Sequence, residues 1–224
     1  MNIANDGSKY GADQYRLAHN YDLKSSSFTI VADGQKYTMS FAGREKLTFD
    51  NGNGSQEFDY ECHKIEDDTY FVRFGEQAAV LELAGSFATL VLSDGYHFGA
   101  IDTDGQTGDG ILHGFTDEVV GTTAQWVLGC DKFVTHKYDN ADSCKVAWSP
   151  KGDDFADCTI KYVKIKDAIY LIDVTGAIPD DAPPPPRSNR YIALQDYDHM
   201  LFVGCILGKS PPLMIGGYGE FPDL

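Results

Sequence analysis

The second half of this 224-residue sequence repeats the strand pattern of the first half, and this internal repeat constrains the fold more than any other feature. Residues 64–72 (Lys-Ile-Glu-Asp-Asp-Thr-Tyr-Phe-Val) match residues 164–172 (Lys-Ile-Lys-Asp-Ala-Ile-Tyr-Leu-Ile) at an offset of 100. Upstream, residues 46–49 match residues 145–148 at an offset of 99, and a third match keeps the same order at an offset of 96. Chance similarity between β-hairpins explains one such match, but three in register indicate a duplicated unit.

Each repeat consists of short runs rich in Val, Ile, Phe, Tyr and Thr, broken by Gly, Asp and Asn, and this pattern predicts strands. The predicted strands are 28–32, 36–41, 46–49, 57–65, 69–74, 79–83, 87–92, 123–128, 132–138, 145–148, 159–165, 169–174, 191–194 and 199–207. Two antiparallel sheets with one apolar face each bury those faces against each other or by closing into one wall. We therefore expect an all-β fold: a calycin- or lipocalin-like antiparallel β-barrel built from two repeated half-units, or a pair of half-barrels.

The expected organisation is one compact barrel domain. Its parts are an N-terminal extension (1–27), a first β repeat (28–101), a Gly/Asp linker (102–112), a second β repeat (113–208) and a C-terminal tail (209–224). The linker opens with Asp-x-Asp-Gly, as calcium loops do, but has no Glu at the twelfth position, so a plain linker is favoured over a calcium site. Four consecutive prolines at 183–186 predict an extended excursion between two strands.

Charge and cysteine content exclude several classes of protein. Eighteen Lys and Arg against 34 Asp and Glu give a net charge of −16, which repels nucleic acid and anionic membrane surfaces. The sequence has no apolar stretch of spanning length and no apolar signal segment near its start, so we expect a cytoplasmic protein. Five cysteines without a C-x-x-C pair indicate reduced, mostly buried thiols. A monomer and a homodimer formed through sheet edges are both compatible with the acidic surface.

The turn at 67–68 sets a predicted register for the hairpin around it. In that register Glu61 and His63 point toward the apolar inner wall, and so does Lys161, the counterpart of Glu61 in the second repeat. Burying ionisable groups on such a wall costs free energy unless the groups are paired, hydrated or used in binding or catalysis. The alternative is that they lie at a wet barrel mouth, or that a one-residue bulge turns them outward.

The predicted strand at 132–138 has two possible orientations. One of them buries Lys137, and the other buries His136 and Tyr138. An unpaired ammonium group costs far more to bury than a neutral imidazole, so we expect His136 and Tyr138 to face inward. Trp148 then becomes a wall residue beside them, either as simple core packing or as part of a ligand site.

Aromatic side chains dominate the predicted inner wall, and a wall of this kind suits a flat or polyunsaturated ligand of modest size. The expected wall residues are Tyr37, Phe41, Phe49, Tyr70, Trp148 and Tyr170.

At these positions the sequence resembles the MoaF family. Residues 113–121 (His-Gly-Phe-Thr-Asp-Glu-Val-Val-Gly), 136–138 (His-Lys-Tyr), Trp148 and 162–171 are similar to the C-terminal MoaF domain. Residues 60–72 are similar to the Tyr-Glu…Ile…Tyr-Phe-Val hairpin of the N-terminal domain. The resemblance implies a calycin-type fold related to lipocalins and phenolic acid decarboxylases, and it implies little about the reaction.

The sequence has no nucleophile elbow, zincin, dinucleotide-binding or P-loop motif, which leaves chemistry without a cofactor. The first hypothesis is a lyase, isomerase or cyclase acting on a small aromatic or polyunsaturated molecule. In it His136 or Glu61 transfers a proton, with His63 as a further candidate, while Tyr138 and Lys161 hold a substrate oxygen. Decarboxylation of a phenolic acid is one version, suggested by analogy of fold alone.

Two other hypotheses stay open. In the second hypothesis the protein is a carrier of a hydrophobic small molecule, with the same aromatic wall and no proton transfer. In the third hypothesis His63 binds a metal together with His136 or His199, although no two histidines have the spacing of ligands on one element.

Overall fold

The computed structural model describes residues 14–102, 112–130, 132–148, 154–176, 189–208 and 212–220. These residues form two compact units. One unit contains Ala18–Gly114 and Val163–Asp167, and the other contains Phe115–Tyr162 and Ala168–Leu224. In the described ranges all regular secondary structure is β-strand, so the expected all-β class is confirmed. No helix in this part of the chain has the length and apolar character that crossing a membrane requires.

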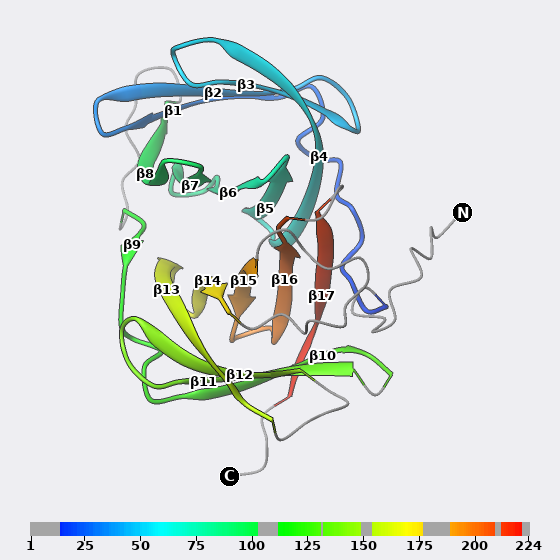
Figure 1. Cartoon of the computed structure of the whole chain (residues 1–224). Helices are drawn as coiled ribbons and strands as arrows, with labels where there is room; N and C mark the ends of the chain where they lie inside the picture. Colours follow the sequence, from blue (N-terminus) through cyan, green and yellow to red (C-terminus); the bar gives the residue numbers. More distant parts are fainter. Residues whose placement is uncertain are drawn as a thin grey trace. The chain divides into compact units, whose positions relative to one another are not determined.

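The first barrel is a closed antiparallel sheet in which every strand pairs with the next one along the chain (Figure 1). Pairing of β8 with β1 completes the circle. The strands are β1 (Ser27–Ala32), β2 (Gln35–Phe41), β3 (Lys46–Asp50), β4 (Ser55–Glu66), β5 (Thr69–Phe74), β6 (Gln77–Glu82), β7 (Phe87–Leu92) and β8 (Gly95–Asp102).

The second barrel has the same strand order as the first. Its sheet runs β12-β11-β10-β17-β16-β15-β14-β13, pairing of β12 with β13 closes it, and β9 (Gly114–Phe115) extends it beside β13. The strands are β10 (Thr123–Gly129), β11 (Lys132–Tyr138), β12 (Ser143–Trp148), β13 (Ala156–Lys166), β14 (Ile169–Thr175), β15 (Arg190–Asp196), β16 (Leu201–Ile206) and β17 (Leu213–Glu220). The repeats matched in the sequence therefore correspond strand by strand, with β1–β8 equivalent to β10–β17.

The structure differs from the expected organisation in the number of barrels. We expected two half-units to share one barrel, whereas each repeat closes by itself, because each has an eighth strand that the sequence pattern missed. These strands are β8 and β17, and β17 lies in the segment that we expected to be an external tail. Eight strands are enough to close a small barrel around its own side chains. Most of the predicted linker and the four prolines lie outside the described residues.

Glycines in the two missed strands explain both why they were missed and how the barrels close. Gly99 of β8 pairs with Ala32 of β1, and a Cβ atom at Gly99 would lie 2.8 Å from the Cβ of Ala32. Gly219 of β17 pairs with Trp126 of β10, and a Cβ atom there would lie 2.8 Å from the indole ring. Only glycine permits such close approach, although it lowers the strand propensity read from the sequence.

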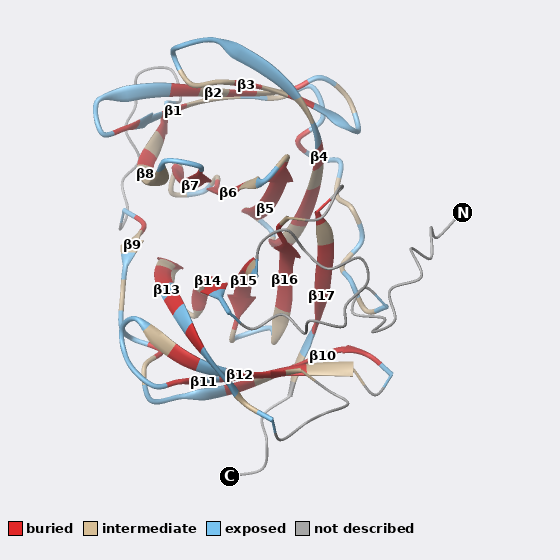
Figure 2. Cartoon of the chain, in the orientation of Figure 1, coloured by how far each residue is buried: buried red, intermediate tan, exposed pale blue. Residues whose placement is uncertain are grey.

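Each barrel has its own apolar core. The side chains of Tyr37, Met39 and Phe41 alternate inward along β2 of the first barrel, and those of Trp126 and Leu128 do so along β10 of the second. Two of the described strands, β5 and β7, are buried at every position and so on both faces (Figure 2).

Candidate functional site

The structure places the predicted wall residues in two different interiors. Tyr37, Phe41, Phe49 and Tyr70 belong to the core of the first barrel, whereas Tyr138 belongs to that of the second barrel, where Trp148 and Tyr170 pack against it. Buried His136 stacks on Tyr138 there. The expected inward orientation of His136 and Tyr138 is therefore confirmed, and their roles in chemistry stay a prediction.

Glu61 and His63 do not face the interior of the first barrel, because the predicted hairpin register was wrong by one residue. Cys62 pairs with Val72 and faces inward, and Glu61 pairs with Arg73 on the outer face. The ladder shifts between Lys64 and Glu66, which is the β-bulge that the sequence left open as an alternative.

A buried ion pair occupies the outer face at this point. Nη2 of Arg73 donates to Oε1 of Glu61 at 3.1 Å, and the Arg73 side chain is only 5% exposed. Nε2 of His63 lies 3.7 Å from the other carboxylate oxygen. Pairing offsets part of the cost of burying these charges, while Nε of Arg73 and both ring nitrogens of His63 have no hydrogen-bond partner among the described residues.

Lys161 is also turned away from the barrel interior. It is exposed between Ile160 and Tyr162, both of which belong to the core of the second barrel. Its Nζ lies 5.9 Å from the ring centroid of Phe115. Both side chains line an open surface pocket of about 470 Å³, which is separate from the barrel interior.

A chain of polar side chains crosses the interior of the second barrel. Nε2 of His136 lies 2.6 Å from the hydroxyl oxygen of Tyr191, and neither residue is exposed. The imidazole stacks on the ring of Tyr138, with centroids 5.7 Å apart and planes 12° apart. The ring of Trp148 meets Tyr191 edge-on at 5.7 Å.

Gln195 connects the remaining hydroxyl groups. The hydroxyl of Tyr138 donates to Oε1 of Gln195 at 2.8 Å, and that of Tyr197 donates to the same oxygen at 3.1 Å. The sequence analysis missed Tyr191, Gln195 and Tyr197. The alternation Tyr191, Ala193, Gln195 along β15 was the available signal, because period two places all three side chains on one face.

Burial keeps this polar group uncharged. Desolvation lowers the pKa of His136 to about 3, so its imidazole is neutral at physiological pH. Desolvation likewise raises the pKa values of Tyr138 and Tyr191 well above the ordinary value, so both phenols keep their protons. The buried polar side chains that meet here, His136, Tyr138, Tyr191 and Gln195, are therefore all uncharged.

Two polar atoms of the group have unused hydrogen-bonding capacity. Nδ1 of His136 and Nε2 of Gln195 are buried and have no hydrogen-bond partner among the residues that the structure describes. The indole nitrogens of Trp126 and Trp148 are also buried and have no hydrogen-bond partner among the described residues. Buried polar atoms normally find partners, so four such atoms on β10, β11, β12 and β15 of one barrel are the arrangement expected of a site that receives a polar ligand or ordered water.

The interior of the first barrel has a different character. Its tyrosine hydroxyls have partners at the ends of strands. The hydroxyl oxygen of Tyr37 lies 3.1 Å from Nδ1 of His97, and the hydroxyl of Tyr60 donates to the carbonyl oxygen of Gly43 at 2.9 Å. His97 is in turn 3.1 Å from Asp94. Because these groups satisfy one another, the first barrel presents a packed apolar core.

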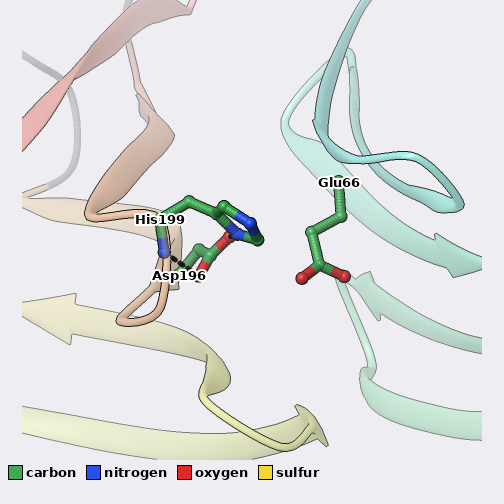
Figure 3. Close-up of side chains that lie close together, drawn as sticks. All are labelled: Glu66, Asp196 and His199. Carbon is green, nitrogen blue, oxygen red and sulfur yellow. Dashed lines mark hydrogen bonds and ion pairs between the residues drawn. The ribbon is translucent and has the colours of Figure 1, made fainter.

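The turn between β15 and β16 contains the remaining histidine considered as a metal ligand. Nδ1 of His199 lies 2.8 Å from Oδ2 of Asp196, and Oδ1 of Asp196 accepts the backbone N–H groups of Asp198 and His199 (Figure 3). Glu66, drawn in the same view, belongs to the other unit. The carboxylate of Asp196 thus serves as a cap for its own turn.

Fold and interior together define an all-β protein with two closed eight-stranded antiparallel barrels, consistent with two repeated calycin-like units whose interiors can accommodate small molecules. No family model and no curated protein matches the sequence.

Proposed function

We propose that the second barrel binds a small, neutral, aromatic or polyunsaturated molecule and moves a proton on it without a cofactor, as a lyase or isomerase does. The observation that carries the proposal is the uncharged group formed by His136, Tyr191, Tyr138 and Gln195, with buried polar atoms that lack partners among the described residues. A ligand with a carbonyl or hydroxyl oxygen supplies those partners, and the surrounding aromatic rings hold its flat body.

Proton transfer by His136 needs no ionised intermediate. With a pKa of about 3 the imidazole is a poor base by itself. Nδ1 can, however, take a proton from one substrate atom while Nε2 gives its proton to the Tyr191 hydroxyl at 2.6 Å, and that hydroxyl passes its own proton to a second substrate atom. Such a relay changes the tautomer and leaves the site neutral, which suits a shift of a proton between two atoms of one substrate.

The uncharged character of this polar group also bears on the choice of substrate. His136, Tyr138, Tyr191 and Gln195 offer no positive charge to a carboxylate, and burying an unpaired carboxylate is costly. Decarboxylation of a phenolic acid is therefore less well supported than isomerisation of a neutral molecule such as an enone.

The resemblance to MoaF supports the same location. His136, Tyr138 and Trp148, which come from its C-terminal motif, all lie along one interior wall. Membership of that family and a cytoplasmic location are part of this proposal.

Solvent exchange tests the proposal. The protein is incubated in D₂O with neutral aromatic enones, and nuclear magnetic resonance follows deuterium entering the carbon next to the carbonyl group. We expect exchange by the wild type, at least a tenfold loss in His136→Gln, and no loss in the matched variant Tyr37→Phe, which removes a histidine-bonded hydroxyl from the other barrel. Binding without exchange favours the carrier function, and exchange that survives in His136→Gln contradicts the assigned role.

A further inference from the structure

The second barrel contains a pair of cysteines that the proposed function does not use. Cys144 of β12 and Cys158 of β13 are direct partners in the antiparallel ladder that closes the barrel. Both side chains face inward, since both belong to the core, while Lys145 and Asp157 beside them face out. None of the five cysteines, each within the described ranges, forms a disulfide bond.

We infer that Cys144 and Cys158 form a reversible disulfide bond across the seam of the second barrel when the protein meets a peroxide. Direct partners in an antiparallel pair have Cα atoms about 4.5–5.5 Å apart. Disulfides need a Cα separation of about 4.4–6.8 Å, so the ladder already holds the two residues within range. The bond requires no change of register.

The two thiols are not equivalent. A hydrogen bond between them raises the pKa of Cys144 and lowers that of Cys158, which makes Cys158 the group that ionises first. Cys158 is also the more accessible of the two residues, at 6% exposed against 1% for Cys144. Because the thiolate is the reactive form, Cys158 is the nucleophile and Cys144 resolves the product.

The reaction balances with hydrogen peroxide as the oxidant. The Cys158 sulfur attacks one peroxide oxygen, the O–O bond breaks, and sulfenic acid and one water are formed. The Cys144 sulfur then attacks the sulfenic sulfur, the S–O bond breaks, and the oxygen leaves with the thiol proton as a second water. Two thiols and one peroxide thus give one disulfide and two waters.

The bond would lie next to the polar interior. Cys144 pairs on its other side with Tyr138 of β11, so oxidation links β13 covalently to the strand beside Tyr138. The inference stands on the geometry of the two strands, and it does not depend on whether the barrel holds a ligand.

Peptide mapping of the folded full-length chain tests the inference. Cys130 is the exposed cysteine and is removed first by Cys130→Ser, which leaves the paired thiols and the buried Cys62 and Cys205 as internal controls. After dilute hydrogen peroxide, the free thiols are alkylated under denaturing conditions and the chain is analysed by mass spectrometry. We expect two alkyl groups on the oxidised chain instead of four, a cross-link between the peptides of Cys144 and Cys158, and full reversal by dithiothreitol.

Single substitutions in the same background separate the two roles. In Cys144→Ser we expect oxygen to be added to Cys158, because the resolving thiol is gone, and in Cys158→Ser we expect no oxidation of Cys144. Retention of all thiols in the oxidised folded protein overturns the inference. A cross-link that joins other cysteines, or one that forms only after unfolding in urea, also overturns the inference. These results do not require either single variant to fold.

Discussion

Replacing Tyr191 by Phe tests whether the buried hydrogen bond to His136 is as important as its geometry indicates. Nε2 of His136 and the hydroxyl oxygen of Tyr191 are 2.6 Å apart, and both residues are fully buried. The substitution removes the hydroxyl and leaves Nε2 of His136 without that partner. A buried polar group that loses its partner costs about 1–3 kcal/mol, so we expect the free energy of unfolding to fall by that amount.

Urea unfolding followed by tryptophan fluorescence measures this loss in the relevant barrel. The chain has two tryptophans, Trp126 and Trp148, and both pack in the second barrel. Tyr218→Phe is the matched control, because Tyr218 lies in the same barrel and is 51% exposed. Exposed positions change stability by no more than about 0.5 kcal/mol. A loss below about 0.5 kcal/mol in Tyr191→Phe, equal to that of the control, refutes the reasoning.

Three further predictions concern pH, a buried ion pair and barrel closure. Because the pKa of His136 is about 3 in the folded chain and 6.5 as the unperturbed value, the unfolded state binds more protons between these values. The stability that neutral His136 contributes is therefore fully present above about pH 6.5, and the free energy of unfolding falls by up to about 1.4 kcal/mol per pH unit as pH decreases toward 3. In urea unfolding at a series of pH values, His136→Gln gives a shallower dependence of this free energy on pH. Asp173 is 8% exposed and accepts two bonds from Arg190, at 2.8 and 2.6 Å, so Asp173→Ala lowers the free energy of unfolding by about 1–3 kcal/mol, measured by calorimetry. Gly99→Ala places a Cβ atom 2.5 Å from the carbonyl oxygen of Val31, and circular dichroism shows a melting temperature lowered by an overpacking cost of about 1–3 kcal/mol.

Each of these predictions has its own contradicting result. Equal pH slopes in the wild type and His136→Gln show that the imidazole titrates normally. An unchanged enthalpy and midpoint in Asp173→Ala show that the ion pair adds nothing. For Gly99→Ala the matched control is Gly114→Ala, where an added Cβ atom meets nothing within 4 Å. Equal melting temperatures of these two variants contradict the close approach of β8 and β1.

The sequence predicted most of the strands and the repeat, because alternating apolar residues and a kept order of motifs are local signals. It did not predict closure of each repeat, since that depends on β8 and β17. Their glycines weaken the strand pattern and matter only when a neighbouring strand is near, as Ala32 is to Gly99.

The candidate site was predicted in part for a similar reason. The cost of burying Lys137 gave the correct orientation of His136 and Tyr138, because that argument needs only the alternation of one strand. Glu61 was assigned inward from a turn-based register, and the bulge between Lys64 and Glu66 reverses the assignments along β4. The assignment of Lys161 was carried over from the same register. Tyr191 was missed because its role depends on a contact with a strand 55 residues away in sequence.

The central claim is that the second barrel holds a small neutral molecule against His136 and Tyr191. Native mass spectrometry of the protein purified without denaturation tests it most directly, with the double substitution His136→Gln and Tyr191→Phe as comparison. We predict a bound mass that is released on unfolding and is lost or strongly reduced in the double variant. An identical bound mass in both proteins, or none in the wild type even after incubation with neutral aromatic enones, contradicts the claim.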